Sequence, residues 1–300
     1  MLPGIVSDVP IHRGLSSLVG SYDVFIVDLW GVLHDGVRAF PEAVACLEQL
    51  KARSKQVLIL SNAPRRAEAV AERTVELGVA PRLFDAVVSS GEAVWRNLEA
   101  RRDPWYRALG RRCYHLGPER DFGMRAGLDL DFVEDLAAAD FILNTGALSS
   151  DDTVEAYAPL LEAALRRGLP MVCANPDLEV IRGGRREICA GAVAALYERL
   201  GGQVRYDGKP HRSIYQACFD ELGLDRPLVR PGTMLAIGDS LRTDIAGAQA
   251  VGIAGLFVAG GIHAEELGMV EGAPPDPAAL AALFKARDTY PLAVLDALRW

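Results

Sequence analysis

The chain has 300 residues and a formal net charge of −8 at neutral pH. Its length suits about two domains, and the acidic balance argues against a nucleic-acid-binding surface while leaving a small anionic ligand possible. Five scattered cysteines without a Cys-x-x-Cys spacing indicate reduced thiols and predict a cytoplasmic protein. No apolar run approaches the ~18 residues of a membrane span, and the first residues lack the regions of a signal peptide.

A short helix within residues 16–19 precedes the first predicted strand, which runs from Val24 to Asp28 and is almost wholly apolar or β-branched. Gly31 then imposes a sharp turn, which leaves Asp28 at the carboxyl end of that strand. The next predicted elements are a helix over 41–53, a strand over 56–60, a helix with Pro64 in its first turn that ends by residue 77, and a strand over 85–88.

The pattern changes between about residues 95 and 205, where strands are predicted over 113–116, 140–143 and 170–174 and helices over 154–167 and 190–200. The first pattern then returns, with helices over 213–222 and 243–251, strands over 234–237 and 255–258, and further helices after a proline-rich turn at 274–277. Strands that alternate with helices on both sides of the middle stretch predict an α/β fold. The expected architecture is a doubly wound parallel sheet with an inserted domain.

Acidic side chains follow two of the predicted strands. Asp28 lies at the sheet edge where open α/β sheets bind ligands, and a carboxylate there is unfavourable unless a metal or a lysine accompanies it. Asp239 and Asp244 lie at the junction between strand 234–237 and the next helix. The three carboxylates could form an oxygen cage for Mg²⁺, although each alone is also explained as a turn residue or a helix cap.

Groups that could hold a phosphate accompany these carboxylates. Ser61 and Asn62 end strand 56–60 just before a helix, where hydroxyl and backbone N–H groups can face an anion. Lys209 stands between Gly208 and Pro210 and is one of four lysines in the chain. An anionic nucleophile, a metal and a cation around a phosphoryl group form the arrangement that phosphoryl transfer needs.

Four motifs resemble those of the haloacid dehalogenase superfamily: Asp28-Leu-Trp-Gly-Val, Leu60-Ser61-Asn62, Gly208-Lys209-Pro210 and Gly238-Asp239-Ser240-x-x-Thr243-Asp244. The large insertion between the second and third motifs is similar to the branch that contains 4-nitrophenyl phosphatases, phosphoglycolate phosphatase and pyridoxal phosphatase. The resemblance implies a Rossmann-like core, residues 1–95 and 206–300, and an inserted α/β cap domain, residues 96–205. It also implies a homodimer, because relatives with this cap often pair through it.

The resemblance further implies a Mg²⁺-dependent phosphatase acting on a small phosphorylated metabolite, such as a sugar phosphate. Asp28 would be the nucleophile and would bind Mg²⁺ together with Asp239 and the backbone carbonyl of Trp30. Asp244 would be a further ligand or would orient Lys209. The phosphate-binding residues would be Ser61, Asn62 and Lys209.

Trp30 departs from the family pattern. Phosphatases of this superfamily have a second aspartate there, which protonates the leaving group and activates water, and an indole can do neither. Because such proton transfer contributes ~10²–10⁴-fold in rate, the substitution predicts a slow phosphatase. His34 or Asp35 could supply the proton instead, or good leaving groups could need no acid. Two further hypotheses are a catalytically weak or silent binder of a phosphorylated metabolite and a haloacid dehalogenase, which has Tyr at this position but uses no Mg²⁺.

Within the insertion, Asn175 and Asp177 are expected on a loop after a strand, where they could read hydroxyl or amino groups of the substrate. The run Arg182-Gly-Gly-Arg185-Arg186 could face an anionic tail of the substrate, although solvated surface is the simpler explanation. His115 and His211 are expected to be neutral packing residues.

Overall fold

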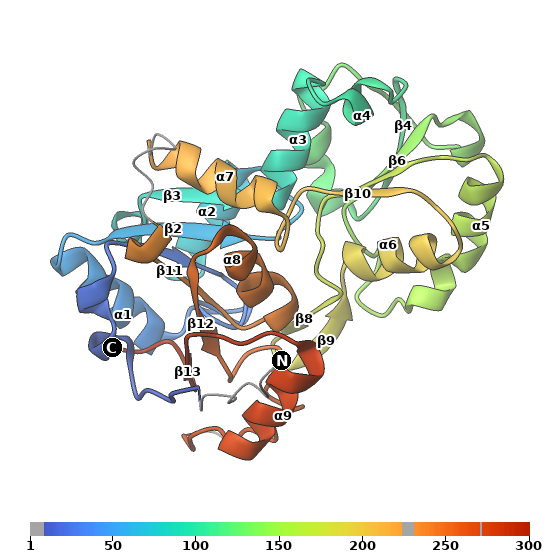
Figure 1. The fold of residues 1–300 in the computed structure, drawn as a ribbon. Coiled ribbons are helices and arrows are strands. Elements are labelled where there is room, and N and C mark those ends of the chain that lie inside the picture. Colours follow the sequence, from blue (N-terminus) through green and yellow to red (C-terminus); the bar gives the residue numbers. More distant parts are fainter. Residues whose placement is uncertain (1–8, 224–230, 271) are drawn as a thin grey trace, which may run out of the picture.

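The computed structural model describes residues 9–223, 231–270 and 272–300. It contains two parallel sheets side by side, one formed by the two ends of the chain and the other by its middle (Figure 1). The predicted α/β class with a doubly wound parallel sheet is therefore confirmed. No helix of the described ranges is long and apolar enough to span a membrane.

The larger sheet has six parallel strands in the order β13-β12-β11-β1-β2-β3. Their bounds are β1 Val24–Val27, β2 Gln56–Ser61, β3 Ala86–Ser89, β11 Met234–Gly238, β12 Ala254–Val258 and β13 Ala293–Leu295. Because side chains alternate along a strand, Phe25 and Val27 of β1 face α1 (Pro41–Ala52) and α2 (Ala67–Glu76). Val24 and Ile26 face the opposite layer of α7 (Arg212–Glu221) and α8 (Ala246–Val251).

The topological switch point of this sheet lies between β1 and β11. The chain leaves β1 through α1 on one face and leaves β11 through α8 on the other, so the two connections diverge. Such a divergence opens a crevice at the carboxyl ends of the two strands, where ligands of open α/β sheets bind. The first residues beyond these ends are Asp28 and Asp239.

The second sheet has five parallel strands in the order β10-β7-β6-β4-β5. Their bounds are β4 Arg112–Leu116, β5 Asp131–Val133, β6 Phe141–Asn144, β7 Met171–Cys173 and β10 Val204–Tyr206. Helices α5 (Ala158–Arg166) and α6 (Ala190–Arg199) cover one face, and α3 (Ser90–Ala100) and α4 (Pro104–Arg107) the other. The predicted boundary at 95/96 falls within α3, and the domain boundaries stay a prediction.

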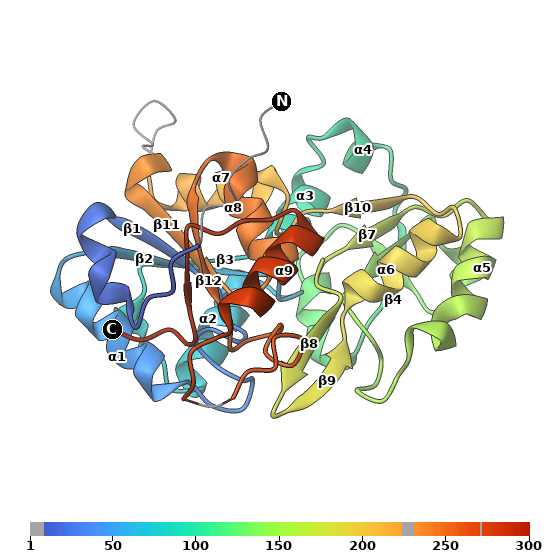
Figure 2. The ribbon, with the colours of Figure 1, turned by 60° about the horizontal axis from the view of Figure 1, so that its bottom comes forward.

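A short antiparallel hairpin of the middle segment, β8 (Glu179–Arg182) and β9 (Arg185–Ile188), reaches the larger-sheet unit (Figure 2). The backbone N–H of Gly183, in its turn, donates to the carbonyl of Asp35 at 3.2 Å. The guanidinium of Arg182 lies 5.0 Å from the ring centroid of Trp30. The hairpin therefore forms one wall of the space between the two sheets.

Several predicted elements were wrong or missing. The helix expected to include Pro64 begins only at Ala67, because Ser89 Oγ donates to Arg65 O at 2.6 Å and Glu92 accepts from Ala67 N–H at 3.2 Å. These bonds hold residues 62–66 as a loop. One helix, α9 (Pro277–Arg287), follows the proline-rich turn instead of several, and the chain then enters β13. Strands β5, β8, β9, β10 and β13 were not predicted. The first four are short and carry charged residues, and β13 is only three residues long and lies where helices were expected.

Two contacts join the segments where the chain enters and leaves the second sheet. The hydroxyl of Tyr106, in α4, donates to the carboxylate of Asp207, just after β10. Arg205, in β10, pairs with Asp103 at 2.8 Å. Because Tyr106 and Asp207 are both buried, this hydrogen bond is shielded from water.

Tyr106→Phe removes the hydroxyl that donates to Asp207. We expect the free energy of unfolding to fall by about 1–3 kcal/mol, because a buried carboxylate then loses a donor. Urea denaturation followed by circular dichroism measures the change. Tyr290→Phe is the matched control, since that side chain is 38% exposed. Equal midpoints for the two variants would show that the bond contributes nothing.

Candidate active site

Three carboxylates meet at the switch point of the larger sheet. The side-chain oxygens of Asp28, Asp239 and Asp244 lie within 4.8 Å of one another. Close approach of the backbone makes this possible, because Gly31 adopts a left-handed conformation with φ of 70°. A Cβ at Gly31 would lie 2.0 Å from Asp239 Oδ2. The turn after β1 therefore requires glycine.

Lys209 reaches this cluster from the loop that follows β10. Its side chain is 2% exposed, and Nζ donates to Asp28 Oδ1 at 2.7 Å, to Asp244 Oδ1 at 2.7 Å and to Leu60 O at 3.1 Å. An ammonium group has three N–H donors. Each donor has an acceptor here, so Lys209 is held in one position.

The electrostatics of the cluster follow from its burial. Burial, and then the neighbouring Asp244 carboxylate, raise the pKa of Asp28 to about 7, although Lys209 opposes this. Burial and the Asp28 carboxylate raise the pKa of Asp239 well above its usual value. Burial alone would lower the pKa of Lys209, but Asp244 and Asp28 raise it well above its usual value. The cluster thus has more negative charge than one lysine balances, which suits a divalent cation.

The hydrogen bonds distinguish the three carboxylates. Asp244 uses both oxygens, accepting from Lys209 and, at 3.1 Å, from the backbone N–H of Ser240. Asp239 Oδ2 accepts from Ile262 N–H at 2.7 Å, and no other hydrogen bond within the described ranges reaches this side chain. Asp28 and Asp239 therefore retain oxygen atoms that could hold a metal ion, whereas the geometry of Asp244 fits the positioning of Lys209.

Ser61 and Asn62 follow β2 beside Lys209. Ser61 Oγ accepts from the N–H of Ala63 at 3.1 Å. The Asn62 amide accepts from Lys209 N–H at 2.8 Å and donates to Lys209 O at 3.2 Å and to Asp177 Oδ1 at 2.9 Å. Asn62 therefore fixes the Lys209 loop with its side chain, and contact with a phosphate would fall to its backbone N–H. Phosphate binding by these residues stays a prediction.

Trp30 lies between the carboxylate cluster and the hairpin β8–β9. Its ring makes an edge contact with His34, with centroids 5.0 Å apart. His34 Nδ1 accepts from Gly36 N–H at 3.1 Å, and burial lowers the pKa of His34 to about 4, so the imidazole is neutral at pH 7. Asp35 Oδ1 accepts from two backbone N–H groups, each at 2.8 Å. These bonds lower the pKa of Asp35, although burial alone would raise it.

Asp177 approaches the cluster from the loop between β7 and β8. Its backbone N–H donates to Asn175 Oδ1 at 2.9 Å, and its carboxylate accepts from Asn62. Arg242 anchors the same loop by donating to the carbonyl of Pro176. Burial raises the pKa of Asp177, while Lys209 opposes the shift. The predicted loop after a strand is present, and its position brings Asp177 close to the cluster.

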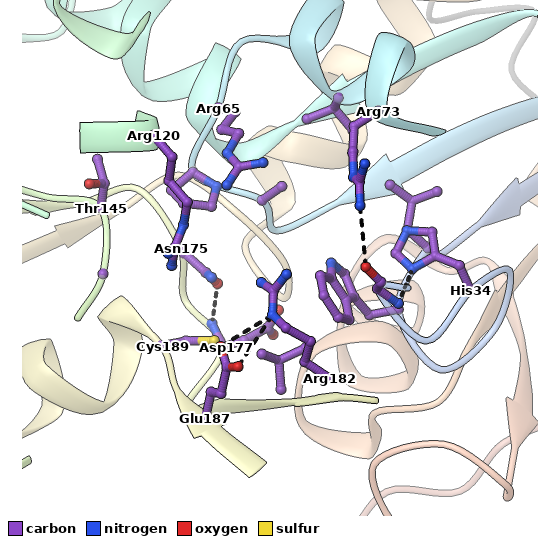
Figure 3. Close-up of a pocket in the computed structure, with 18 of the residues that line it drawn as sticks. His34, Arg65, Arg73, Arg120, Thr145, Asn175, Asp177, Arg182, Glu187 and Cys189 are labelled. Atoms are coloured by element: carbon purple, nitrogen blue, oxygen red, sulfur yellow. Dashed lines mark hydrogen bonds and ion pairs between the residues drawn. The ribbon is translucent and has the colours of Figure 1, made fainter. Parts of the chain in front are cut away.

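Two cavities adjoin the site and share Trp30, Asp177 and Val180 in their linings. The larger, of about 570 Å³, contains Asp28 and Asp239. The smaller, of about 130 Å³, lies between the two sheets and is lined by arginines (Figure 3). Three of these, Arg65, Arg73 and Arg120, were missed by sequence reasoning. The one sequence feature that could have pointed to any of them is the position of Arg65, three residues after the Ser61-Asn62 motif.

The predictions for two histidines and for the arginine run can also be compared with the structure. His115 accepts from Arg125 Nε–H at 2.9 Å and contacts Thr145 Oγ1, and burial lowers its pKa to about 4. Burial also lowers the pKa of His211, which stacks on Tyr206. Both histidines are neutral packing residues, as predicted. In the arginine run, Arg185 pairs with Asp151, and Arg186 pairs with Glu179 and Glu265 at the surface, whereas Arg182 faces the smaller cavity.

Comparisons with known proteins agree with the geometry. A family model described as haloacid dehalogenase-like hydrolase matches residues 25–128, and a second, described as HAD-hydrolase-like, matches 206–283. Bovine (Bos taurus) Chronophin is 31% identical over 244 residues, which are 77% of this chain and 79% of that relative. The D-glycerol 3-phosphate phosphatase of Mycobacterium tuberculosis is 29% identical over 257 residues, 83% of this chain, which spans 66% of that relative's length.

Among solved structures, a hydrolase of the haloacid dehalogenase-like family from Brucella suis 1330 superposes with a TM-score of 0.82. It is 35% identical, and the match covers 96% of this chain and 99% of that one. Both sheets of the present fold are therefore contained in the match.

Asp239→Asn keeps the acceptor for Ile262 and removes one negative charge from the cluster. Without divalent cations we expect this variant to melt about 2–4 °C above the unmodified chain, because buried like charges repel. With Mg²⁺ the order should reverse, because only the unmodified chain binds the ion tightly. Thermal melts in EDTA and in MgCl₂ measure both, with Glu155→Gln, an exposed carboxylate outside the cluster, as control. The same order in both buffers would contradict a metal site here.

Proposed function

This chain belongs to the haloacid dehalogenase-like hydrolases, as its motifs predicted, and we propose that it is a Mg²⁺-dependent phosphatase acting on a small phosphate monoester. The observation that carries the proposal is the buried contact of Lys209 with Asp28, at 2.7 Å, inside a cluster of three carboxylates. This contact supports the proposal because a carboxylate that could act as nucleophile lies beside a fixed cation at the sheet edge where ligands bind. The similarity to a glycerol 3-phosphate phosphatase supports a small phosphate ester as substrate.

The proposed reaction has two displacements at phosphorus. The Asp28 carboxylate attacks the phosphorus atom, the bond to the leaving-group oxygen breaks, and the phosphoryl group is carried as an aspartyl-phosphate. Water then attacks the same phosphorus atom, and the Asp28 carboxylate and inorganic phosphate are released. Lys209 holds Asp28 in position and offsets negative charge, while Ser61 and the backbone N–H of Asn62 would bind phosphoryl oxygens.

Asp28, Asp239 and the backbone carbonyl of Trp30 would hold Mg²⁺. No hydrogen bond within the described ranges ends on the Trp30 carbonyl, so this oxygen is free for the role. When bound, the ion supplies positive charge that offsets the charge of the phosphoryl oxygens. Asp244 would hold Lys209 in position, because its carboxylate accepts a hydrogen bond from Lys209 Nζ at 2.7 Å.

Because an indole cannot act as an acid, a residue other than Trp30 must protonate the leaving group. His34 is neutral at pH 7 and gives Nδ1 to Gly36, and Asp35 is ionised and uses one oxygen to hold its own turn. Asp177 differs from both, because its pKa is raised, mainly by burial, whereas theirs are lowered. It also lines both cavities and spends one oxygen on Asn62. We infer that Asp177 protonates the leaving group in place of the aspartate that the family has at position 30.

A second candidate, a silent binder of a phosphorylated metabolite, is favoured by one observation, the indole at position 30. Trp30 fills the space beside the cluster with a side chain that has no acid–base chemistry. The homodimer and the cytoplasmic location remain expectations from the sequence.

Phosphate release from a panel of small phosphate monoesters tests the function. In Mg²⁺ buffer we expect turnover by the unmodified chain and none above background by Asp28→Asn, because an amide cannot form the aspartyl-phosphate. Trp30→Asp separates the two candidates, since it creates activity in a silent binder and only alters the rate of a working phosphatase. Absence of release above the Asp28→Asn blank from every ester would overturn the phosphatase proposal.

Asp177→Asn tests the proposed proton donor, and its amide oxygen can still accept from Asn62. We expect kcat to fall about 10²–10⁴-fold for alkyl phosphates, whose alkoxide must be protonated on leaving. Turnover of 4-nitrophenyl phosphate should fall far less, because its phenolate leaves without a proton. Steady-state kinetics on both esters measure this, with Glu155→Gln as control. Equal losses on the two esters would assign Asp177 a structural role only.

A further inference from the structure

The smaller cavity, called here the arginine cavity, collects positive charge in an acidic protein. Its lining contains four arginines, Arg65, Arg73, Arg120 and Arg182, against two carboxylates, Asp177 and Glu187. The four come from the loop after β2, from α2, from residues 119–125 and from the end of β8. In Figure 3, Arg65 and Arg120 enter from one side and Arg182 from the opposite side. The fold has therefore brought together cations that are far apart in the sequence.

Many of the guanidinium N–H groups of these arginines have no hydrogen-bond acceptor among the described residues. Arg65 pairs with Asp121 through Nε at 2.8 Å, and Arg182 contacts Glu187 through Nε at 3.3 Å. The terminal nitrogens of both guanidinium groups make no hydrogen bond within the described ranges. Arg120 makes no hydrogen bond or ion pair with any residue that the structure describes. Guanidinium groups with free terminal nitrogens are the side chains that bind carboxylates and phosphates in a bidentate manner.

The position of the arginine cavity relates it to the reaction. It shares Trp30 and Asp177 with the larger cavity that contains Asp28. It does not include Asp28 or Lys209, so it cannot be the place of the transferred phosphoryl group. A leaving group that extends past Trp30 from Asp28 would enter the arginine cavity with its far end.

We propose that the arginine cavity binds a second anionic group, a carboxylate or a further phosphate, at the far end of the leaving group, with Arg120, Arg182 and Arg65 as donors. This proposal rests on the proposed phosphatase function and narrows its substrate to phosphate monoesters whose leaving group carries a second anionic group. The indole of Trp30 lines the path between the two anionic ends, and the Arg182 guanidinium lies 5.0 Å from its ring centroid. Both ends of the substrate would thus be bound at fixed sites, so the protein would select substrates by the distance between their two anionic groups.

The test uses a series of ω-carboxyalkyl phosphates of two to six carbons, each matched with its neutral carboxamide, and the corresponding alkanediol bisphosphates. For at least one chain length we expect kcat/KM to be higher for the charged ester than for the amide, mainly through a lower KM. Arg120→Gln and Arg182→Gln should each reduce that ratio about tenfold, the loss expected for one charge-assisted hydrogen bond. Arg166→Gln, an exposed arginine of α5 outside both cavities, should leave the ratio unchanged.

Two kinds of failure are distinguishable. Turnover without any preference for the charged esters, or a preference that survives both arginine substitutions, would overturn the arginine cavity while leaving the phosphatase intact. If no ester is turned over, the phosphatase proposal fails. Calorimetric titration of Asp28→Asn with each charged ester and its neutral carboxamide then shows whether the arginine cavity binds the second anionic group. Tighter binding of the charged ester that is lost in Asp28→Asn/Arg120→Gln would still support it, and equal binding would refute it. A preference for the bisphosphates over the carboxylates would identify the second group as phosphate, and the reverse as carboxylate.

Discussion

The buried ammonium of Lys209 is the interaction on which the rest of the site depends. Burying a lysine is unfavourable unless its charge is paired and its donors are used, and here Asp28, Asp244 and Leu60 O meet both needs. The three acceptors belong to different elements: the end of β1, the helical turn after β11 and strand β2. The chain therefore reaches a low free energy only when these parts and the loop after β10 come together, which couples folding of the core to assembly of the site.

Most of the carboxylate cluster could be predicted from the sequence, because Asp28 and Asp239 directly follow apolar runs that form neighbouring parallel strands. Local patterns of this kind determine which residues lie at a sheet edge. The Asn62 side chain could not be assigned in this way, since its partner Lys209 is 147 residues away and its bonds depend on the final fold. The same holds for Arg65 and Arg120, which meet only across the space between the two sheets. The stretch from Pro64 to Arg66, expected as the first turn of a helix, is likewise held as a loop by distant side chains, Ser89 and Glu92.

Trp30 combines a backbone carbonyl that could still bind a metal with a side chain that has no acid–base role. The backbone of this residue still turns beside the cluster, so its carbonyl remains available, while the side chain has become an apolar wall shared by both cavities. That wall also contacts Arg182 of the hairpin β8–β9, a part of the middle segment. A carboxylate at this position would add negative charge to a cavity that Asp28, Asp177 and Asp239 already line. In the proposed reaction, the leaving group takes its proton from Asp177, on the loop between β7 and β8, rather than from the turn after β1.

The paired segments at Tyr106–Asp207 and Asp103–Arg205 hold the two ends of the middle segment next to each other. Because entry and exit are adjacent, the whole segment can vary in size or sequence without any change in the path of β1, β2 or β11. Such an arrangement lets selection act on the two halves separately. The half that carries the carboxylates could stay constant while the half that carries Arg120 and Arg182 is replaced as a unit to suit another substrate.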